Sequence, residues 1–316
     1  MTSTNATAPA KLPAGEIPWN HYRMQKKLSD HIVDIIIWLL LAAIVVIITY
    51  PIWFILIASV SDQNAVNLGK VTLLPVGFNW DGYREIFADT RIWDGYRNTI
   101  VYSVVGTALN MLVTLPAAFA LSRKELGKVR RVVLFFFSLT MFVSGGMIPT
   151  YLLFKSLGLV DNWLVFILPS AVNVYNLIIA RSFFETAVPE ELFDSAKVDG
   201  MSYGGYFLKI VLPLSSAVIA VVALYYFVYH WNEFFTGLMY INDDSRKPLQ
   251  NVLQAILLSN QTGAEGSASL DAAAQQELAD KIKYGVIFVS SLPLLVIYPF
   301  LQKYFNKGVL LGAVKG

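Results

Sequence analysis

The chain has 316 residues, of which 56% are hydrophobic and only 15% are charged. This composition is too apolar for a typical soluble domain and predicts an all-α membrane protein that crosses the bilayer several times. The net charge of +2 does not suggest a nucleic-acid partner, and the absence of cysteine excludes disulfides, thiolate zinc sites and cysteine nucleophiles.

The first segment, residues 1–30, is polar and rich in Pro, Ala and Thr. It lacks the features of a signal peptide, so we expect a cytoplasmic tail that is disordered or interfacial, followed by an uncleaved first span. Six apolar stretches within residues 31–305 are long enough to cross the hydrocarbon core as helices, and a short tail, 306–316, follows them. The predicted spans are Ile32–Val60, Asn98–Leu121, Val132–Phe154, Trp163–Phe184, Ile210–Phe235 and Tyr284–Tyr304.

The basic residues predict the orientation of these spans. With both termini in the cytoplasm, fifteen Lys and Arg lie on inside segments and nine on the longer outside segments, and the inside loop Arg123–Arg131 alone carries five. The positive-inside rule therefore favours cytoplasmic N- and C-termini. Two outside segments, about 61–97 and 236–283, are long enough to suggest contact with a partner, although a hydrophilic spacer would also explain them.

Residues 185–209, between spans four and five, are predicted to form a cytoplasmic helix–turn–helix. Pro189–Glu191 favours a helix start, and Gly200 after Asp199 favours a stop. Ser202 can cap the second helix, which we expect to bend at Pro213 as it enters the membrane.

The first helix of this segment is about three turns long and would present Leu192, Phe193 and Ala196 on one side. A helix this short is not stable alone in water, so it needs a surface to pack against. The segment is either a docking element or an ordinary cytoplasmic connector.

A spaced pattern in this segment favours docking. Asp194-Ser195-Ala196, three residues, Gly200, nine residues and Ile210-Val211-Leu212-Pro213 together resemble the EAA loop of permease subunits of bacterial ABC importers. Asp194 and Ser195 stand where that pattern has Glu and Ala. The resemblance implies that the loop docks into an ATPase through Glu190, Glu191, Asp194, Ser195, Ala196, Asp199, Gly200, Ile210 and Pro213.

The stretches "GGMIPTYLLFKSLGLVDNWLVFILPSAVNVYNLIIARSFF", "HWNEFF" and "KGVLLGAVKG" extend the resemblance to the MalG-type carbohydrate permeases, within the branch that imports oligosaccharides or polysaccharide fragments. The resemblance implies a type I ABC importer permease fold in the bacterial cytoplasmic membrane. It also implies three partners: a second homologous permease, a cytoplasmic ABC ATPase dimer and an extracellular or periplasmic sugar-binding protein.

The chain has no G-x-x-x-x-G-K-[ST] loop and no H-E-x-x-H pair. We therefore expect a transport subunit that is not an enzyme and holds no cofactor or metal, with ATP and Mg bound by the partner ATPase. An ion- or proton-coupled carrier is the alternative, but its ionisable residues would lie near the midplane, whereas Asp34, Lys155, Arg181 and Glu233 lie near span ends. A membrane scaffold would leave the coupling loop without a role.

A carbohydrate path needs aromatic faces for sugar C–H surfaces and amides or carboxylates for hydroxyl groups. Such side chains lie in span four and near the outer end of span five. For Tyr229 and Trp231 the other interpretation is an interfacial aromatic belt, and for the two asparagines it is hydrogen bonding between helices. The candidates are Asn173, Tyr175, Asn176, Tyr229, His230, Trp231, Asn232 and Glu233.

Overall fold

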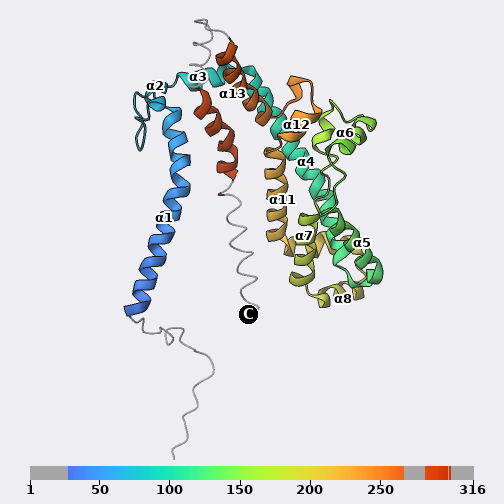
Figure 1. Ribbon diagram of the computed structural model, residues 1–316. Helices are drawn as coiled ribbons and strands as arrows, with labels where there is room; N and C mark the ends of the chain where they lie inside the picture. Colours follow the sequence, from blue (N-terminus) through green and yellow to red (C-terminus); the bar gives the residue numbers. More distant parts are fainter. Residues whose placement is uncertain (1–27, 267–281, 298, 300–316) are drawn as a thin grey trace, which may run out of the picture. The chain divides into compact units, whose positions relative to one another are not determined.

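The computed structural model describes residues 28–266, 282–297 and 299, and nearly all of them are helical (Figure 1). The chain divides into two compact units, one ending at Ile52 and the other beginning at Trp53. Helix α1, Leu28–Ser59, continues across this boundary. The predicted tail 306–316 lies outside the described residues, as do residues 1–27 of the N-terminal tail. Of predicted span six, the part after Ile297 also lies outside them, except residue 299.

Two helices in the described part of the chain are long and apolar enough to cross a membrane, namely α1 and α4, Thr90–Ser122. A third span results if the bent pair Tyr203–Leu214 and Ser216–Trp231 is counted as one. These helices correspond to predicted spans one, two and five. The helix Ile282–Ile297, which overlaps predicted span six, is apolar but shorter.

Predicted span three is wrong as a single helix. The chain forms α5, Gly127–Thr140, and then a separate α6, Met147–Ser156. The break contains Gly146, whose φ of 86° is a conformation that glycine adopts without the steric cost of a side chain. A continuous apolar run therefore concealed a turn.

Predicted span four is also interrupted. A short 3₁₀ turn, Trp163–Phe166, is followed by irregular chain around Pro169, and α7 begins only at Val174 and ends at Ala187. Proline removes a backbone donor, and the Asn173 side chain then caps α7 by accepting a hydrogen bond from the Asn176 N–H at 3.2 Å. Pro169 and the Asn173 cap therefore set the start of α7, although the hydropathy of the segment would allow a longer helix.

The bend before span five is displaced from its predicted position. The chain turns by 85° between Leu214 and Ser216, two residues beyond Pro213. Pro213 is accommodated in the first turn of a short helix, where a missing N–H costs nothing. The elements are α8, Glu190–Val198; α9, Tyr203–Tyr206; a π-helical turn, Phe207–Val211; α10, Leu212–Leu214; and α11, Ser216–Trp231.

The two predicted outside segments contain packed helices, so as far as the structure describes them they are not simple spacers. Buried residues of α3, α13 and the helix Ile282–Ile297 form one apolar cluster with Ile92 at the start of α4. Residues 267–281 lie outside the described part. The elements are α2, Gln63–Asn67; α3, Asp81–Ala88; α12, Phe235–Tyr240; a 3₁₀ turn, Asp244–Arg246; and α13, Leu249–Gly266.

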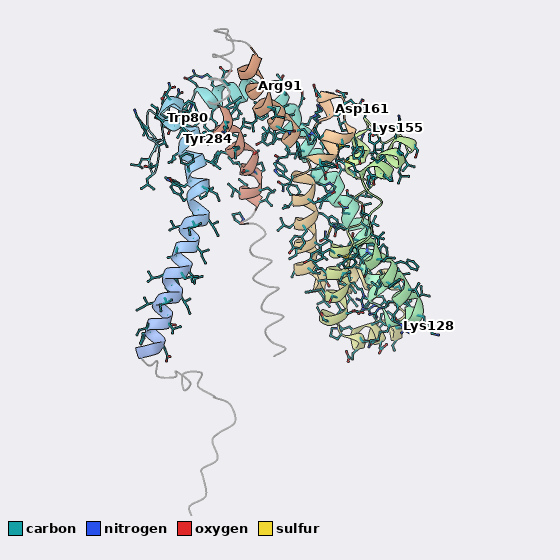
Figure 2. All side chains as sticks on the ribbon, in the orientation of Figure 1. Trp80, Arg91, Lys128, Lys155, Asp161 and Tyr284 are labelled. Carbon is teal, nitrogen blue, oxygen red and sulfur yellow. The ribbon has the colours of Figure 1, made fainter. Side chains whose placement is uncertain are left out.

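Helix α4 organises the second unit, because it packs against α7, α11 and α13 (Figure 1). Its far end contributes Leu115 and Phe119 to a second cluster that also includes buried residues of α7, α8 and α11. Figure 2 shows Arg91 at one end of this helix and Lys128 just beyond the other. One long helix thus connects two separate apolar clusters, each flanked by charged groups.

Candidate functional site

The segment predicted to couple to an ATPase folds as a helix with two well-defined ends. Helix α8 begins at Glu190, directly after Pro189, and ends at Val198. The Met201 N–H donates to the Ala196 carbonyl at 2.9 Å and the Gly200 N–H donates to the Lys197 carbonyl at 3.1 Å, which together form a Schellman motif. Gly200 has a φ of 73°, as this motif requires.

The docking face predicted for α8 is wrong in part. Phe193 and Ala196 are buried within the chain itself, against Tyr206 and Phe184, and only Leu192 of the predicted face is exposed. The helix is stabilised by its own subunit on this side. The opposite side is accessible and mainly polar, with Glu190, Glu191, Asp194, Ser195 and Asp199 exposed, and it also carries Val198, which is 87% exposed. Of the remaining coupling residues, Pro213 is exposed and Ile210 packs partly buried against the same cluster.

Arg123 contacts the helix that was predicted to couple to an ATPase, and the sequence pattern did not reveal this contact. It follows the last turn of α4 and is buried, with its guanidinium carbon 5.2 Å from the Phe119 ring, 5.6 Å from Phe193 and 5.9 Å from Tyr206. Cation–π attraction at a desolvated site of this kind stabilises the packing by up to about 2 kcal/mol. The basic loop after α4, first interpreted as a topology signal, therefore also packs against α8.

Two ion-paired groups reinforce this junction. Glu185 on α7 pairs with Arg181 at 2.8 Å and with Arg130 of α5. Lys124, directly after Arg123, pairs with Glu190 in the first turn of α8, and this hydrogen bond raises the pKa of Lys124. Both groups connect the basic loop to the coupling region.

Residues Gly200–Gly204 also match G-x-S-x-G, the motif around the nucleophilic serine of α/β-hydrolases. In those enzymes the serine lies between a strand and a helix. Here Ser202 follows helix α8 and caps α9 by accepting a hydrogen bond from the Gly205 N–H at 3.2 Å. The pattern therefore serves as a helix cap.

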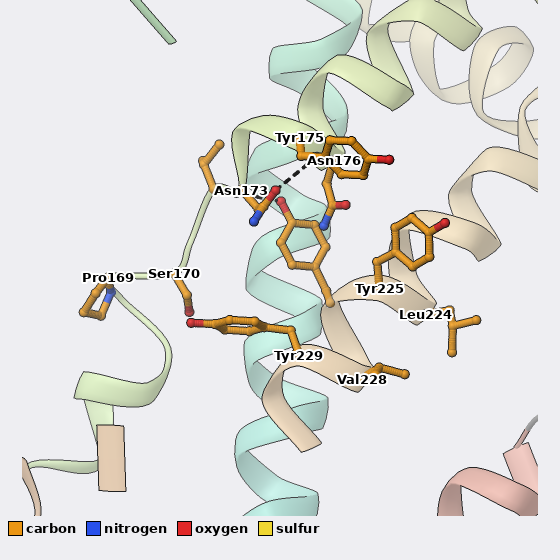
Figure 3. A pocket seen from close by; sticks show the side chains of 11 residues that line it. Pro169, Ser170, Asn173, Tyr175, Asn176, Leu224, Tyr225, Val228 and Tyr229 are labelled. Atoms are coloured by element: carbon orange, nitrogen blue, oxygen red, sulfur yellow. Dashed lines mark hydrogen bonds between the residues drawn. The ribbon is translucent and has the colours of Figure 1, made fainter. Parts of the chain in front are cut away.

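An open groove of about 760 Å³ lies between the segment that leads into α7 and one face of α11 (Figure 3). The side chains of Asn173, Tyr175 and Asn176 approach it from one wall, and those of Tyr225 and Tyr229 from the other. None of its eleven lining residues is charged. Phenol rings beside amides can stack on sugar rings and hydrogen-bond sugar hydroxyl groups.

Helix α4 fixes the position of both walls. The hydroxyl of Tyr226 is 2.7 Å from Thr114 Oγ1 and accepts a hydrogen bond from the Asn173 N–H at 2.9 Å. Asn110, also on α4, donates to the Ser170 carbonyl. Sequence analysis missed Thr114, Asn110, Tyr225 and Tyr226, since a polar residue inside a span has no neighbours in sequence that reveal its partners.

The candidate sugar-path residues at the end of α11 have different surroundings in the structure. Tyr229 lines the groove, whereas His230 is buried, with Nε2 2.7 Å from Asn110 Oδ1. Trp231 is 1% exposed and donates to the Ser290 carbonyl at 3.3 Å, so it lies neither in the groove nor in an interfacial belt. Asn232 and Glu233 lie beyond the helix and bond to Val228 and Thr236, respectively, outside the groove.

Residues 92–311 match the family of binding-protein-dependent transport system inner membrane components. The chain belongs to this family. The permease is 39% identical to the polygalacturonan/rhamnogalacturonan transport system permease protein YtcP of Bacillus subtilis, over 92% of its own length and 100% of that protein. It is also 39% identical to Protein LplC of Bacillus subtilis, over 93% and 99% of the two chains.

The permease also resembles a solved structure, that of a bacterial ABC transporter involved in the import of the acidic polysaccharide alginate. The TM-score is 0.80 at 29% sequence identity, over 89% of the permease and 99% of that chain. The resemblance to carbohydrate permeases of the oligosaccharide branch, and the type I ABC permease fold, are thereby confirmed. The permease is a membrane subunit of a carbohydrate ABC importer.

Proposed function

We propose that the permease crosses the membrane six times, with both termini in the cytoplasm, and forms half of a translocation path whose other half is a second homologous permease. A cytoplasmic ATPase dimer, which binds ATP and Mg, docks on α8 and drives the cycle. A binding protein outside the cell delivers an oligosaccharide. The permease itself carries no cofactor and performs no hydrolysis.

The observation that carries this proposal is that one helix joins the groove to α8, Glu190–Val198, which we call the coupling helix. Helix α7 starts directly after its cap Asn173, in the groove wall, and only two residues separate its end from α8. At 1.5 Å per residue, α7 is a rod of about 21 Å. A movement of α8 imposed by an ATPase is therefore transmitted directly to Asn173, Tyr175 and Asn176.

For the substrate we propose an oligosaccharide of acidic sugars. Two of the similar proteins above are transporters of polygalacturonan/rhamnogalacturonan and of alginate, and polygalacturonan and alginate are acidic polysaccharides. The groove in this subunit offers tyrosines and asparagines and no cation among its lining residues. It would hold the sugar rings and hydroxyl groups, and the second permease would supply the positive charge that balances the carboxylates.

The family match disfavours the ion-coupled carrier considered above. The charged side chains that such a carrier requires are also missing from the lining of this groove. Sugar uptake that persists without ATP hydrolysis but disappears when the proton gradient is collapsed would favour the carrier.

The first test is mild-detergent purification of the tagged permease with all of its bound subunits, in wild type and Gly200→Val. Valine at a φ of 73° is strained, so α8 loses its C-terminal turn, and we expect the ATPase to dissociate while the second permease remains. The matched control is Gly204→Val, because an added Cβ meets no atom within 4 Å at either glycine and only Gly200 has a positive φ.

Gly200→Asn should retain the ATPase, because asparagine tolerates the left-handed region. ATPase retention by Gly200→Val would contradict docking at α8. A wild-type chain that purifies alone or only with itself, in several detergents, would contradict the importer assignment as a whole.

A further inference from the structure

A second cavity, of about 450 Å³, lies where the basic loop meets α5 and α7, and neither the groove nor the coupling face uses it. Its basic lining comes from three elements: the turn after α4, the first turns of α5, and the middle of α7. The lining side chains include no acid. The basic residues are Lys124, Lys128, Arg130, Arg131 and Arg181.

These positive charges are only partly compensated. Glu185 pairs with Arg130 and Arg181 together, and Glu190 pairs with Lys124. Lys128 and Arg131 are exposed and have no ion pair with any residue that the structure describes. After both glutamates are counted, the cavity retains an excess of three positive charges.

The N-terminus of α5 adds further positive potential to the cavity. Lys128 and Arg130 lie in the first turn, which has no acidic residue and no capping side chain. Positive charges oppose the partial positive charge at a helix N-terminus. The arrangement is therefore unfavourable by itself, and an anion in the cavity would relieve it.

The surface next to the cavity is apolar. Leu134 belongs to the lining, and Val132, Phe135 and Phe136, on the same stretch of α5, have 54%, 63% and 60% of their surface exposed. A free anion would use only the cations. An amphiphile would use both parts, with its charged group among the lysines and arginines and its chains along α5.

We propose that this cavity binds the phosphate group of an anionic phospholipid from the cytoplasmic leaflet, with the acyl chains against α5. The side of the membrane rests on the orientation proposed above. Basic cavities at the cytoplasmic ends of membrane helices attract anionic headgroups, and each lysine or arginine near the surface strengthens binding about fivefold. Because Lys124 also pairs with Glu190, a bound lipid would lie directly beside the coupling helix.

The test measures lipid binding rather than transport. The full chain, with whatever subunits accompany it, is reconstituted into phosphatidylcholine nanodiscs that contain spin-labelled phosphatidylglycerol or, separately, spin-labelled phosphatidylcholine. The variant is Lys128→Ala/Arg131→Ala, because both side chains are exposed and without an ion pair, so their loss should not affect folding. The control, Lys70→Ala/Lys155→Ala, removes the same charge at exposed positions outside the cavity.

For the wild type and the control we expect an immobilised phosphatidylglycerol population that phosphatidylcholine does not show. In the variant, which lacks two of these cations, its affinity should fall about 25-fold. Equal immobilisation in all three proteins would overturn the proposal. Inorganic phosphate that displaces the labelled lipid, where chloride of the same ionic strength does not, would show a site for free anions and also overturn it.

A third result would point to a different occupant. If the variant loses the ATPase but retains its selectivity for phosphatidylglycerol, the cavity is a subunit contact and the lipid proposal fails. The spin-label readout needs neither ATP nor sugar. A failure of the importer assignment, seen as missing partner subunits, would therefore be distinguished from a failure of lipid binding.

Discussion

The guanidinium carbon of Arg123 lies 5.6 Å from the centre of the Phe193 ring. Arg123 directly follows the long helix α4, and Phe193 is the buried anchor of the coupling helix α8. The contact therefore joins the central membrane helix to the element that is proposed to receive the movement of the ATPase. Phe119 and Tyr206 complete an aromatic enclosure around the same cation.

Removing this cation should loosen α8 while leaving the membrane helices intact. In Arg123→Ala the loss of a desolvated cation–π site, about 2 kcal/mol, should speed hydrogen exchange of the α8 backbone amides by a factor of roughly 30. Exchange of the α11 amides should not change. Arg123→Lys should show an intermediate effect, because lysine keeps the charge but not the planar group. Equal exchange in α8 of the wild type and the alanine variant would contradict this role.

Tyr229 and Trp231, two residues apart on α11, should respond differently to substitution. Trp231→Ala removes a side chain that is 1% exposed and should destabilise the permease by about 3–5 kcal/mol. Tyr229→Ala removes a groove side chain and should weaken sugar-stimulated ATPase activity up to about tenfold at unchanged melting temperature. Tyr229→Phe separates the ring from the hydroxyl. A lowered melting temperature in Tyr229→Ala, with a normal response of the ATPase activity to sugar, would show that Tyr229 has a structural role and does not contact the sugar.

Gly106 permits the close approach of α4 and His230. A Cβ added at this glycine would lie 2.5 Å from His230 Nε2, the atom that is 2.7 Å from Asn110 Oδ1. Gly106→Ala should therefore destabilise the permease by about 1–3 kcal/mol, measured by thermal unfolding in detergent. Gly145→Ala, whose Cβ would be 3.9 Å from its nearest neighbour, is the control.

A double variant tests whether the imidazole is the cause. Gly106→Ala/His230→Ala should lose less stability than the sum of the two single variants, because the clash is absent once the ring is removed. Strict additivity would show that the effect of Gly106→Ala arises elsewhere.

The cap of α4 gives a pH-dependent prediction. Asp89 accepts a hydrogen bond from the Arg91 N–H at 2.9 Å, and its Oδ2 is 2.7 Å from the Arg91 guanidinium. The side-chain hydrogen bond from Arg91 holds the pKa of Asp89 below its usual value of 3.8. Because the pKa is depressed in the folded state, the stabilisation is complete above pH 3.8 and is lost as the pH falls through the folded pKa.

Asp89→Ala should accordingly cost about 1 kcal/mol of unfolding free energy, to the same extent at pH 7 and at pH 5. The difference from wild type should shrink at pH values below 3.8. Asp89→Asn keeps a capping oxygen without the charge and should lose less. A difference that already disappears between pH 7 and pH 5 would show that Asp89 is not held ionised by Arg91.

The sequence determined those features that depend on neighbouring residues. Pro189 and Gly200 bounded α8 correctly, because proline at a helix start and a positive φ after its end are local backbone requirements. The long apolar runs of α1 and α4 were likewise evident from hydropathy alone. The spacing from Asp194 to Pro213 indicated the family, which the comparisons confirmed.

Hydropathy could not show where the helices in the apolar segments break, or which of their side chains point toward the groove. A run of apolar residues has the same hydropathy whether its helix continues or breaks, so the interruptions at Gly146 and Pro169 were hidden. Tyr229 and Trp231 point about 200° apart around α11, and only packing against α4 and the helix Ile282–Ile297 decides which one faces the groove.

The contacts of Arg123, Thr114 and Tyr226 depend on tertiary structure for the same reason. Phe193 lies 70 residues from Arg123, Tyr226 lies 112 residues from Thr114, and Asn173 lies 53 residues from Tyr226. No local rule specifies how the helices that carry these residues are rotated against one another. Local sequence therefore determined the two ends of α8 and which segments are apolar, whereas the groove and the contacts of Arg123 with α8 formed only when α4, α7 and α11 packed together.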